Sequence, residues 1–461
     1  MKIVVIDDDP PGSQTEHSCP LLLRWDQAAL RKGLGHPSPL LFVLANTRAL
    51  TPEAAAFRNR EIVDALVLAM SAEGLQEHEL LLVSRGDSTL RGHGVLEPQV
   101  LAQAWEEHFA AVDATLHVPA FLEGGRTTVN GVHLLHGEPV HTTAFARDRL
   151  FGYGTSDLAE WLEEKSAGQI AADAVLRIPL ALLEAGRSED LLVCLEALNA
   201  NRSVVVDATH PEQLLALGVA IRRLQGRKRF LFRSAASLLN GLVDSGPSPL
   251  GPQPLDSQGL VGLRRRDPLG QPLPGLVVVG SHVALADQQL TSLLANARCR
   301  GIELPVARIA RVLEGGSSDW LLPDLEAEWR SQLELALEEG LTPVLFSSRG
   351  ELEFGAGAAA RRLRFGMELA YLMARLLAGV APRLGYLISK GGITTGTLLV
   401  EGLGLEAVQL EGQLLPGLSL VRPIAGPSDS LPVITFPGNL GEPDTLTEAW
   451  RWLEGFKGEG L

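Results

Sequence analysis

Short apolar runs alternate along the chain with segments of helical spacing. The apolar runs, several of them rich in β-branched residues, cover residues 3–6, 40–44, 80–83, 203–206, 276–279, 342–346, 386–388 and 433–436. Segments with apolar residues at helical spacing lie between them, at residues 52–69, 96–109, 324–339 and 359–377. Strands that are apolar throughout must be covered on both faces, as they are in βαβ units with parallel sheets. The pattern predicts an α/β protein.

This alternation stops at residues 244–275, which are dense in Pro and Gly and follow neither period. We interpret the stretch as an interdomain linker, with a long surface loop inside one domain as the alternative. The chain has 461 residues, more than one hydrophobic core usually organises. The sequence therefore predicts two domains, 1–245 and 276–461, joined by a linker at 246–275. Each domain should contain a largely parallel sheet flanked by helices.

The net charge and the cysteine content indicate which binding partners and which cellular compartment suit the protein. The formal net charge of −15 argues against binding to nucleic acid or to an acidic membrane surface. The three cysteines lie far apart and form no C-x-x-C pair, which favours a reducing compartment. The first apolar run is too short for a signal peptide, and no run approaches the roughly 20 residues of a membrane span. We expect a cytoplasmic protein, with the oligomeric state left open and a homo-oligomer among the options.

Three consecutive aspartates, Asp7, Asp8 and Asp9, follow the first predicted strand. Ligand groups gather at the carboxyl ends of parallel strands, and adjacent carboxylates are best tolerated where they bind a metal or accept hydrogen bonds from hydroxyls. A solvated acidic turn is the structural alternative. A second alternative is a haloacid-dehalogenase-like phosphatase with Asp7 as its nucleophile, although Pro11 occupies the Thr or Val position of that motif.

A second polar cluster, residues 84–93, follows the strand predicted at 80–83. It contains Arg85, Asp87, Ser88 and Arg91 together with two glycines. Arginine presents a donor fork that binds a carboxylate bidentately, and glycine lets a ligand approach the backbone. Capping of the following helix is the structural alternative, and it is compatible with binding.

Two further segments, residues 119–131 and 145–153, repeat this combination of Gly, Arg and hydrogen-bonding side chains, and the first contains Arg126 and Thr127. Either segment alone is as consistent with plain turns. Together with the clusters described above, they indicate a polar pocket suited to an anionic molecule rich in hydroxyl groups.

The C-terminal half instead has small-residue turns after its strands. Lys390 begins the sequence K-G-G-I-T-T-G-T, in which backbone N–H groups and one cation could face an anion. It is not a Walker A loop, because no G-x-x-x-x-G-K-[ST] occurs in the chain. Ser281 lies in a second turn of this kind, and Gly438 and Asn439 lie in a third. One such turn is usually ordinary, but three in one domain favour a nucleotide site.

The ordered motifs D-D-D-P-P-G, D-S-T-L-R-G, G-R-T, K-G-G-I-T and P-G-N-L-G resemble the four-carbon acid sugar kinases, from residue 6 to residue 441. The family resemblance implies an N-terminal sugar-acid-binding domain, a C-terminal nucleotide-binding domain and an active site in the interdomain cleft. On the sugar-acid side it places Asp8, Asp9, Arg85, Asp87, Ser88, Arg91, Arg126 and Thr127. On the ATP side it places Ser281, Gly391, Gly392, Ile393, Thr394 and Gly438.

The resemblance implies an ATP-dependent transfer of phosphate to a hydroxyl of a small sugar acid. Arg91 and Arg126, with Arg85, would hold the carboxylate, and either Asp9 or Asp87 would accept the proton of the attacking hydroxyl. Mg²⁺ is expected to arrive as the ATP complex, since the sequence contains no dedicated metal cage.

The sequence departs from the family pattern in three places. Pro11 replaces a usual Thr, Ile393 replaces a common Glu, and Phe436-Pro437 replace Lys-Ser. A catalytically silent sugar-acid-binding protein therefore remains an alternative, beside the phosphatase.

Overall fold

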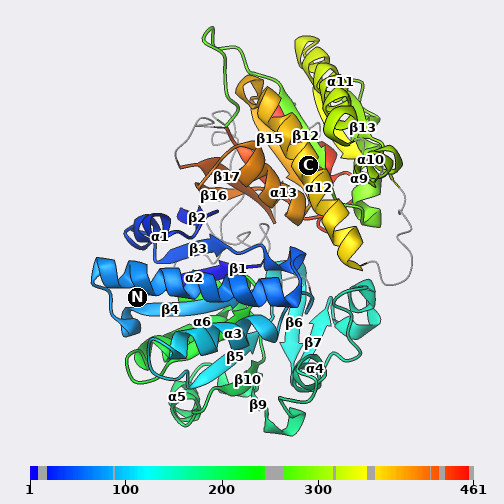
Figure 1. The fold of residues 1–461 in the computed structure, drawn as a ribbon. Coiled ribbons are helices and arrows are strands. Elements are labelled where there is room, and N and C mark those ends of the chain that lie inside the picture. The colour runs from blue at the N-terminus through cyan, green and yellow to red at the C-terminus, as the bar shows by residue number, and fades with distance from the viewer. Residues whose placement is uncertain are drawn as a thin grey trace. The chain divides into compact units, whose positions relative to one another are not determined.

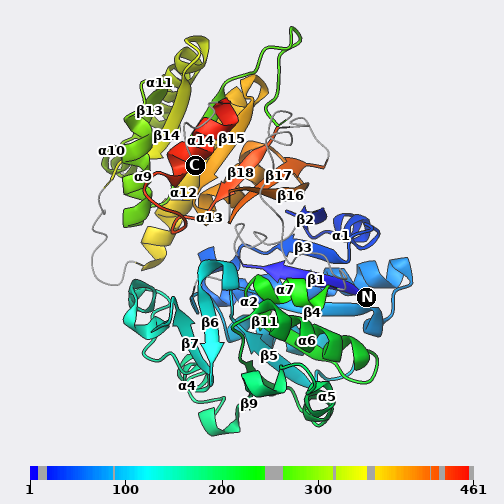
Figure 2. The same ribbon diagram turned by 180° about the vertical axis from the view of Figure 1, so that it is seen from behind.

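The computed structural model describes residues 1–8, 18–86, 89–243, 263–314, 318–349, 359–415, 417–424 and 431–455. The chain divides into two compact units, Met1–Pro252 and Gln253–Leu461 (Figures 1 and 2). Among the described residues, no helix combines the length and the apolar character needed to cross a membrane.

In the first unit, the described strands form a sheet in the order β2-β3-β1-β4-β11-β5-β10-β9, and every neighbouring pair is parallel. The strands are β1 Lys2–Asp7, β2 Cys19–Leu22, β3 Leu40–Leu44, β4 Leu80–Arg85, β5 Ala114–Val118, β9 Leu176–Ile178, β10 Arg202–Val206 and β11 Phe230–Ser234. The central strands are buried along almost their whole length, which requires cover on both faces. Figure 1 shows α2 and α3 in front of this sheet, and Figure 2 shows α6 and α7 on the opposite side.

The helices of this unit begin and end where local chemistry favours it. They are α1 Gln27–Leu34, α2 Pro52–Glu73, α3 Leu96–Glu106, α4 Leu158–Lys165, α5 Ser188–Glu196, α6 Pro211–Arg223 and α7 Ser237–Leu242. In α2, the Thr51 side chain accepts the Ala54 N–H, Pro52 occupies the first turn, and Gly74 ends the helix at φ 70°. A separate three-stranded antiparallel sheet contains β6 Arg126–Val129, β7 Val132–Leu135 and β8 Glu138–Pro139.

In the second unit, the described strands follow the order β13-β14-β12-β15-β18-β17-β16. They are β12 Gly275–Val279, β13 Cys299–Leu304, β14 Thr342–Ser347, β15 Tyr386–Lys390, β16 Ala407–Leu415, β17 Leu418–Pro423 and β18 Val433–Phe436. The pairs from β13 to β18 are parallel, and β17 and β16 add an antiparallel edge. The helices are α9 Ala284–Leu294, α10 Val306–Glu314, α11 Ser318–Glu338, α12 Ala359–Val380, α13 Gly392–Thr397 and α14 Thr445–Glu454.

The α/β class and the largely parallel sheet of each unit are confirmed. All eight apolar runs are strands, and all four segments of helical spacing are helical over most of their length. Of the predicted linker 246–275, residues 246–262 lie outside the described residues. Leu263 is buried in the core of the second unit, and the Arg265 N–H donates to the Gly385 carbonyl. The domain boundaries and the interdomain cleft stay predictions.

Candidate functional site

Three neighbouring strands of the first unit end in charged residues at one edge of the sheet. β1 ends at Asp7 and is followed by Asp8, β4 ends at Arg85, and β11 ends at Arg233 and Ser234. The register pairs Asp7 with Arg85, and Arg85 with Ser234. Because the strands are parallel, these ends meet at the edge where α/β proteins bind ligands. We refer to this group of strand ends as the carboxyl edge.

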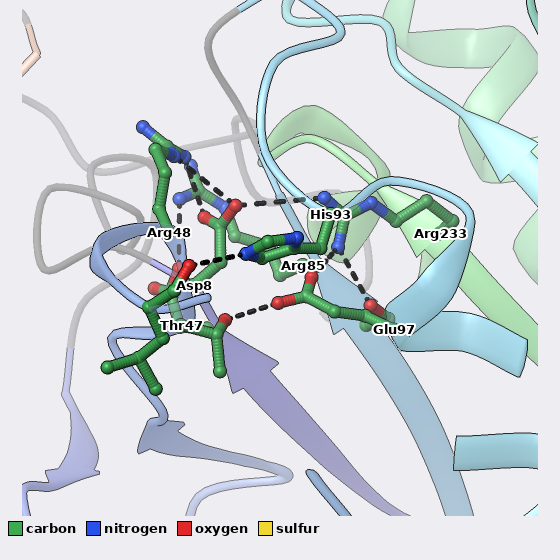
Figure 3. A network of polar contacts seen from close by, with 10 residues as sticks. Asp8, Thr47, Arg48, Arg85, His93, Glu97 and Arg233 are labelled. Carbon is green, nitrogen blue, oxygen red and sulfur yellow. Dashed lines mark hydrogen bonds and ion pairs between the residues drawn. The ribbon is translucent and has the colours of Figure 1, made fainter. Parts of the chain in front are cut away.

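The Asp8 carboxylate lies between two guanidinium groups (Figure 3). Arg48 Nη2 lies 2.6 Å from Asp8 Oδ1, and Arg233 Nη2 lies 3.7 Å from Oδ2. Arg48 comes from the turn Thr47–Ala49, and its backbone N–H donates to the Asp8 carbonyl. Asp8 is buried, so removal of either cation would leave its charge poorly compensated.

Glu97 of α3 connects the other side of this network (Figure 3). It is buried, accepts a hydrogen bond from the Thr47 hydroxyl and forms an ion pair with Arg233. Burial raises the pKa of Glu97, and the charge of Arg233 opposes that rise. Arg233 also donates to Ser84 Oγ at 2.9 Å, and a Cβ at Gly86 would overlap its guanidinium. Only glycine at position 86 leaves room for Arg233 against the backbone.

Asp7 and Arg85 form a second buried ion pair, with Arg85 Nη1 3.2 Å from Asp7 Oδ1. Both side chains are 1% exposed. A phosphatase nucleophile must reach its substrate, whereas the Asp7 carboxylate lies inside the sheet against a cation. The haloacid-dehalogenase alternative is therefore not favoured. The Arg85 side chain, predicted to bind a carboxylate, lies against Asp7, and its part in ligand binding stays a prediction.

Arg91 is partly exposed and follows a strained turn. Thr89 and Leu90 have φ values of 55° and 66°, and the Tyr153 hydroxyl donates to the Thr89 carbonyl at 2.8 Å. Arg91 Nη1 lies 3.2 Å from Asp148 Oδ2. The contact with Tyr153 holds the turn in a conformation that non-glycine residues rarely adopt.

Arg126 begins β6, with its guanidinium 4.7 Å from the ring centroid of Phe121. Its pKa is lowered to about 9 by burial, and the positive charges of Arg85 and Arg48 add to the shift. The charges of Arg48 and Arg85, which come from distant parts of the sequence, therefore act on Arg126. Such a concentration of positive charge suits an anionic ligand, although the whole chain is acidic. Thr127 pairs with Leu134 in the same small sheet.

Several predicted residues of the first half lie outside the described residues, namely Asp9, Pro11, Asp87 and Ser88. The described part of the chain contains no group of three or more His, Cys, Asp or Glu side chains that could hold a metal ion.

In the second unit, three small-residue turns pack against one another. The Gly280 and Ser281 N–H groups donate to the Lys390 carbonyl, and the Gly391 N–H donates to the Phe436 carbonyl. A Cβ at Gly280 would overlap Thr394 Oγ1, and Gly391 has a φ of 121°. These contacts bring together the turns predicted to bind nucleotide, as expected for the ends of the neighbouring strands β12, β15 and β18.

A second set of contacts involves the side chains of these turns. A Cβ at Gly438 would overlap Ser281 Oγ. Gly392 and Ile393 form the start of α13, Ile393 is 38% exposed, and Asn439 is exposed after the partly buried Gly438. No ligand contact follows from these positions alone, so their roles stay predictions.

Lys390 points into the protein. Its Nζ donates to the Pro437 carbonyl at 2.9 Å and lies 3.8 Å from the ring centroid of Phe436. Burial lowers the pKa of Lys390 to about 7. In this arrangement the side chain holds the Pro437 turn, and its predicted contact with a phosphate stays a prediction.

The sequence interpretation did not include Thr47, Arg48, Glu97 or Arg233 in the site. Arg233 offered the best signal, because it lies one residue before the end of the short run Phe230–Ser234, near the position that Arg85 occupies at the end of β4. Glu97 resembles an ordinary acidic residue in the first turn of a helix, and Arg48 lies in a short turn without a motif.

Comparison with known proteins gives the same division of the chain in two. A family model described as a sugar-binding N-terminal domain matches residues 3–242, and one described as a nucleotide-binding C-terminal domain matches residues 276–446. The crystal structures of a Salmonella typhimurium LT2 protein and a Haemophilus influenzae protein share the fold, with TM-scores of 0.61 and 0.60 at 18% and 14% identity. Each alignment covers 98% of this chain, and 99% and 100% of the two proteins.

Relatives named as kinases of four-carbon acids are similar over most of their length. The D-threonate kinase of Salmonella typhimurium is 25% identical over 98% of this chain and 99% of its own. The D-erythronate kinase of Heliobacterium modesticaldum is 25% identical over 98% and 97%, and the 3-oxo-tetronate kinase of Pectobacterium atrosepticum is 24% identical over 83% and 82%. Both domain models match the chain, and its relatives are named as kinases of four-carbon acids. The chain therefore belongs to the four-carbon acid sugar kinase family that its motifs resemble.

Proposed function

We propose that the protein is an ATP-dependent kinase that phosphorylates a hydroxyl group of a four-carbon sugar acid. The observation that carries this proposal is the concentration of arginines at the carboxyl edge, where the charges of Arg48 and Arg85 act on Arg126. A site built this way favours a small anion. The relatives named as threonate, erythronate and 3-oxo-tetronate kinases supply the class of that anion.

The ionic network explains how the first unit would hold such a substrate in one orientation. Asp8, Glu97 and Arg233 are fixed by ion pairs before any ligand binds. Phosphoryl transfer depends mainly on positioning and on stabilisation of charge, so a prearranged site is an advantage. Arg91, which is partly exposed, is the arginine best placed to reach the carboxylate of the acid, and Arg126 would add its positive charge to the site.

The attacking hydroxyl needs a proton acceptor and a phosphoryl donor. Asp9 and Asp87 remain the two candidates for the base, one after Asp8 and one after Gly86. The three packed turns of the second unit would bind ATP, and Mg²⁺ bound to the ATP phosphates would neutralise part of their charge. We expect the protein to be cytoplasmic, and its oligomeric state stays open.

A coupled assay for ADP release tests the proposal. The purified protein is mixed with MgATP and, separately, with D-threonate, L-threonate, D-erythronate and a 3-oxo-tetronate. ADP release that depends on one of these acids supports the kinase. Acid binding in calorimetry without ADP release would instead indicate a catalytically silent binding protein. Phosphate release from a sugar-acid phosphate without ATP would indicate a phosphatase.

A further inference from the structure

A small cavity lies beside Arg233, at the carboxyl ends of β4, β5 and β11. Its volume is about 30 Å³. Since a water-sized group needs about 10–15 Å³ of such space, roughly two polar atoms fit inside. Its walls include Thr89, Arg91, His117, Trp161 and Arg233, and none of the described residues that line it is acidic.

Three of these side chains have a buried polar atom for which the described residues provide no hydrogen-bond partner. The atoms are Thr89 Oγ1, His117 Nδ1 and Trp161 Nε1. The side chains come from a turn, from β5 and from α4, and the exposed fraction of each residue is 5% or less. Proteins rarely leave buried polar atoms unpaired, because each unpaired atom loses the hydrogen bonds that water would give it. Three of them around one cavity point to a polar occupant.

The charge around the cavity indicates what that occupant is. Arg91 and Arg233 both line it, and burial together with the positive charge of Arg233 lowers the pKa of His117 to about 3. His117 is therefore neutral at pH 7, and the indole N–H of Trp161 can only donate. Two cations, an obligate donor and a hydroxyl favour an occupant that accepts hydrogen bonds and carries negative charge.

We infer that this cavity is the subsite for the carboxylate end of the sugar acid, with Trp161 Nε1 and Thr89 Oγ1 donating to the carboxylate oxygens. This inference rests on the proposed function. The volume has space for about two water-sized groups, which matches the two oxygens of a carboxylate. The rest of the substrate then extends from the cavity along Arg233 toward Asp8, because Arg233 both lines the cavity and contacts Asp8. Trp161, Thr89 and His117 thereby select an acid over a neutral sugar.

Trp161→Phe tests the subsite by removing the indole N–H while keeping an aromatic ring. The KM for the acid should rise about 10- to 100-fold, the range for one hydrogen bond to a charged group, while the KM for ATP stays unchanged. Trp105→Phe is the matched control, since Trp105 is equally buried in the first unit but lines a different cavity. Equal effects of the two substitutions on the acid KM would overturn the inference. His117→Asn provides a second probe of the same cavity if Trp161→Phe does not fold.

A direct measurement separates this inference from the proposed function. Indole N–H signals of ¹⁵N-tryptophan-labelled protein are recorded without ATP, and the Trp161 signal is identified by its loss in Trp161→Phe. Titration with the four-carbon acid should shift this signal, whereas the matching sugar alcohol should not. A shift with both compounds, or no shift in a protein that releases ADP with the acid, overturns the subsite and leaves the kinase intact. An acid-specific shift without any ADP release supports the subsite and refutes the kinase.

Discussion

Arg91→Ala offers the sharpest test of how the acid is recognised. In the protein, Arg91 pairs with Asp148 at 3.2 Å and lies 4.9 Å from the ring centroid of Phe145. Because the two paired side chains are 22% and 25% exposed, the ion pair contributes only about 0–1 kcal/mol to stability. The contact with the ring adds about 0.5–1 kcal/mol. The substitution should therefore leave the protein folded.

The expected effect on catalysis is larger than the effect on stability. A hydrogen bond from Arg91 to the substrate carboxylate is worth about 1.5–3 kcal/mol. Its loss should lower kcat/KM for the acid by about ten- to a hundredfold or more. Arg91→Lys should recover only part of this loss, because an ammonium group cannot reproduce the bidentate fork. The matching sugar alcohol should be a poor substrate, and its kcat/KM should barely change.

Asp148→Asn is the control for a purely structural role of Arg91. Asp148 Oδ1 accepts the backbone N–H groups of Leu150 and Phe151, so an amide oxygen at the same position can keep both hydrogen bonds. The substitution removes the counterion of Arg91 and leaves Arg91 itself in place. We expect nearly full kcat/KM for the acid in Asp148→Asn. If both variants lose activity in parallel with stability, Arg91 is structural. If kcat/KM falls equally for the acid and for the alcohol in Arg91→Ala, Arg91 faces the phosphate.

Three further predictions concern the base, the nucleotide and acid stability. Asp9→Asn and Asp87→Asn identify the base. The variant that lacks the base should lose a factor of about 10²–10⁴ in kcat, while calorimetry shows that it still binds the acid. Equal, small losses in both variants would exclude both residues as the base. Gly280→Ala places a methyl group against Thr394 and should weaken ATP binding while acid binding survives; unchanged ATP affinity would contradict the nucleotide site. Burial and the charge of Arg126 lower the pKa of His133 to about 3, so the unfolded chain binds the extra proton and stability falls as the pH drops from about 6.5 toward 3. His133→Gln should flatten this fall by about 1.4 kcal/mol per pH unit in urea unfolding between pH 5.5 and pH 4, where the unfolded histidine is protonated and the folded one is neutral, and equal slopes would contradict it.

The central strands could be predicted because their local pattern agrees with their environment. The runs that form β1, β3 and β4 are apolar and buried on both faces, so only strands in a covered parallel sheet suit them. The placement of Asp8 and Arg85 at one edge followed from the same reasoning, since neighbouring parallel strands end together.

The site residues that the sequence did not reveal are mostly brought together by contacts between distant parts of the chain. β5 has the sequence A-T-L-H-V and β11 the sequence F-L-F-R-S, and the polar residues in both interrupt an already short apolar run. Arg233 and Glu97 are 136 positions apart, and Arg48 and Asp8 are 40 apart. No spacing rule connects such pairs. Their proximity depends on the strand order, which a single sequence does not specify.

The direction of a side chain at a strand end is equally hard to predict. Lys390 precedes a glycine turn, and its contact with a phosphate stays a prediction. In the sheet it pairs in register with Phe436 of β18, and its ammonium group lies over that ring and against the Pro437 carbonyl. The neighbouring strand therefore determines where this cation points, and the sequence around Lys390 contains no information about that neighbour.

Burial separates the arginines of the carboxyl edge into two kinds. Arg85 and Arg233 are nearly inaccessible and are paired with the buried carboxylates Asp7 and Glu97. Breaking such a pair typically costs about 3–5 kcal/mol, so these arginines are fixed and cannot turn toward a substrate without a large penalty. Their charges nevertheless act at short range, as the lowered pKa of Arg126 shows. The ion pairs hold these arginines in place, which reduces the cost of ordering the site when an anion binds. Under the proposed function, direct contact with the acid comes from Arg91 and from the cavity residues Trp161 and Thr89. Substitution of Arg85 should therefore reduce stability before it reduces specificity for the acid.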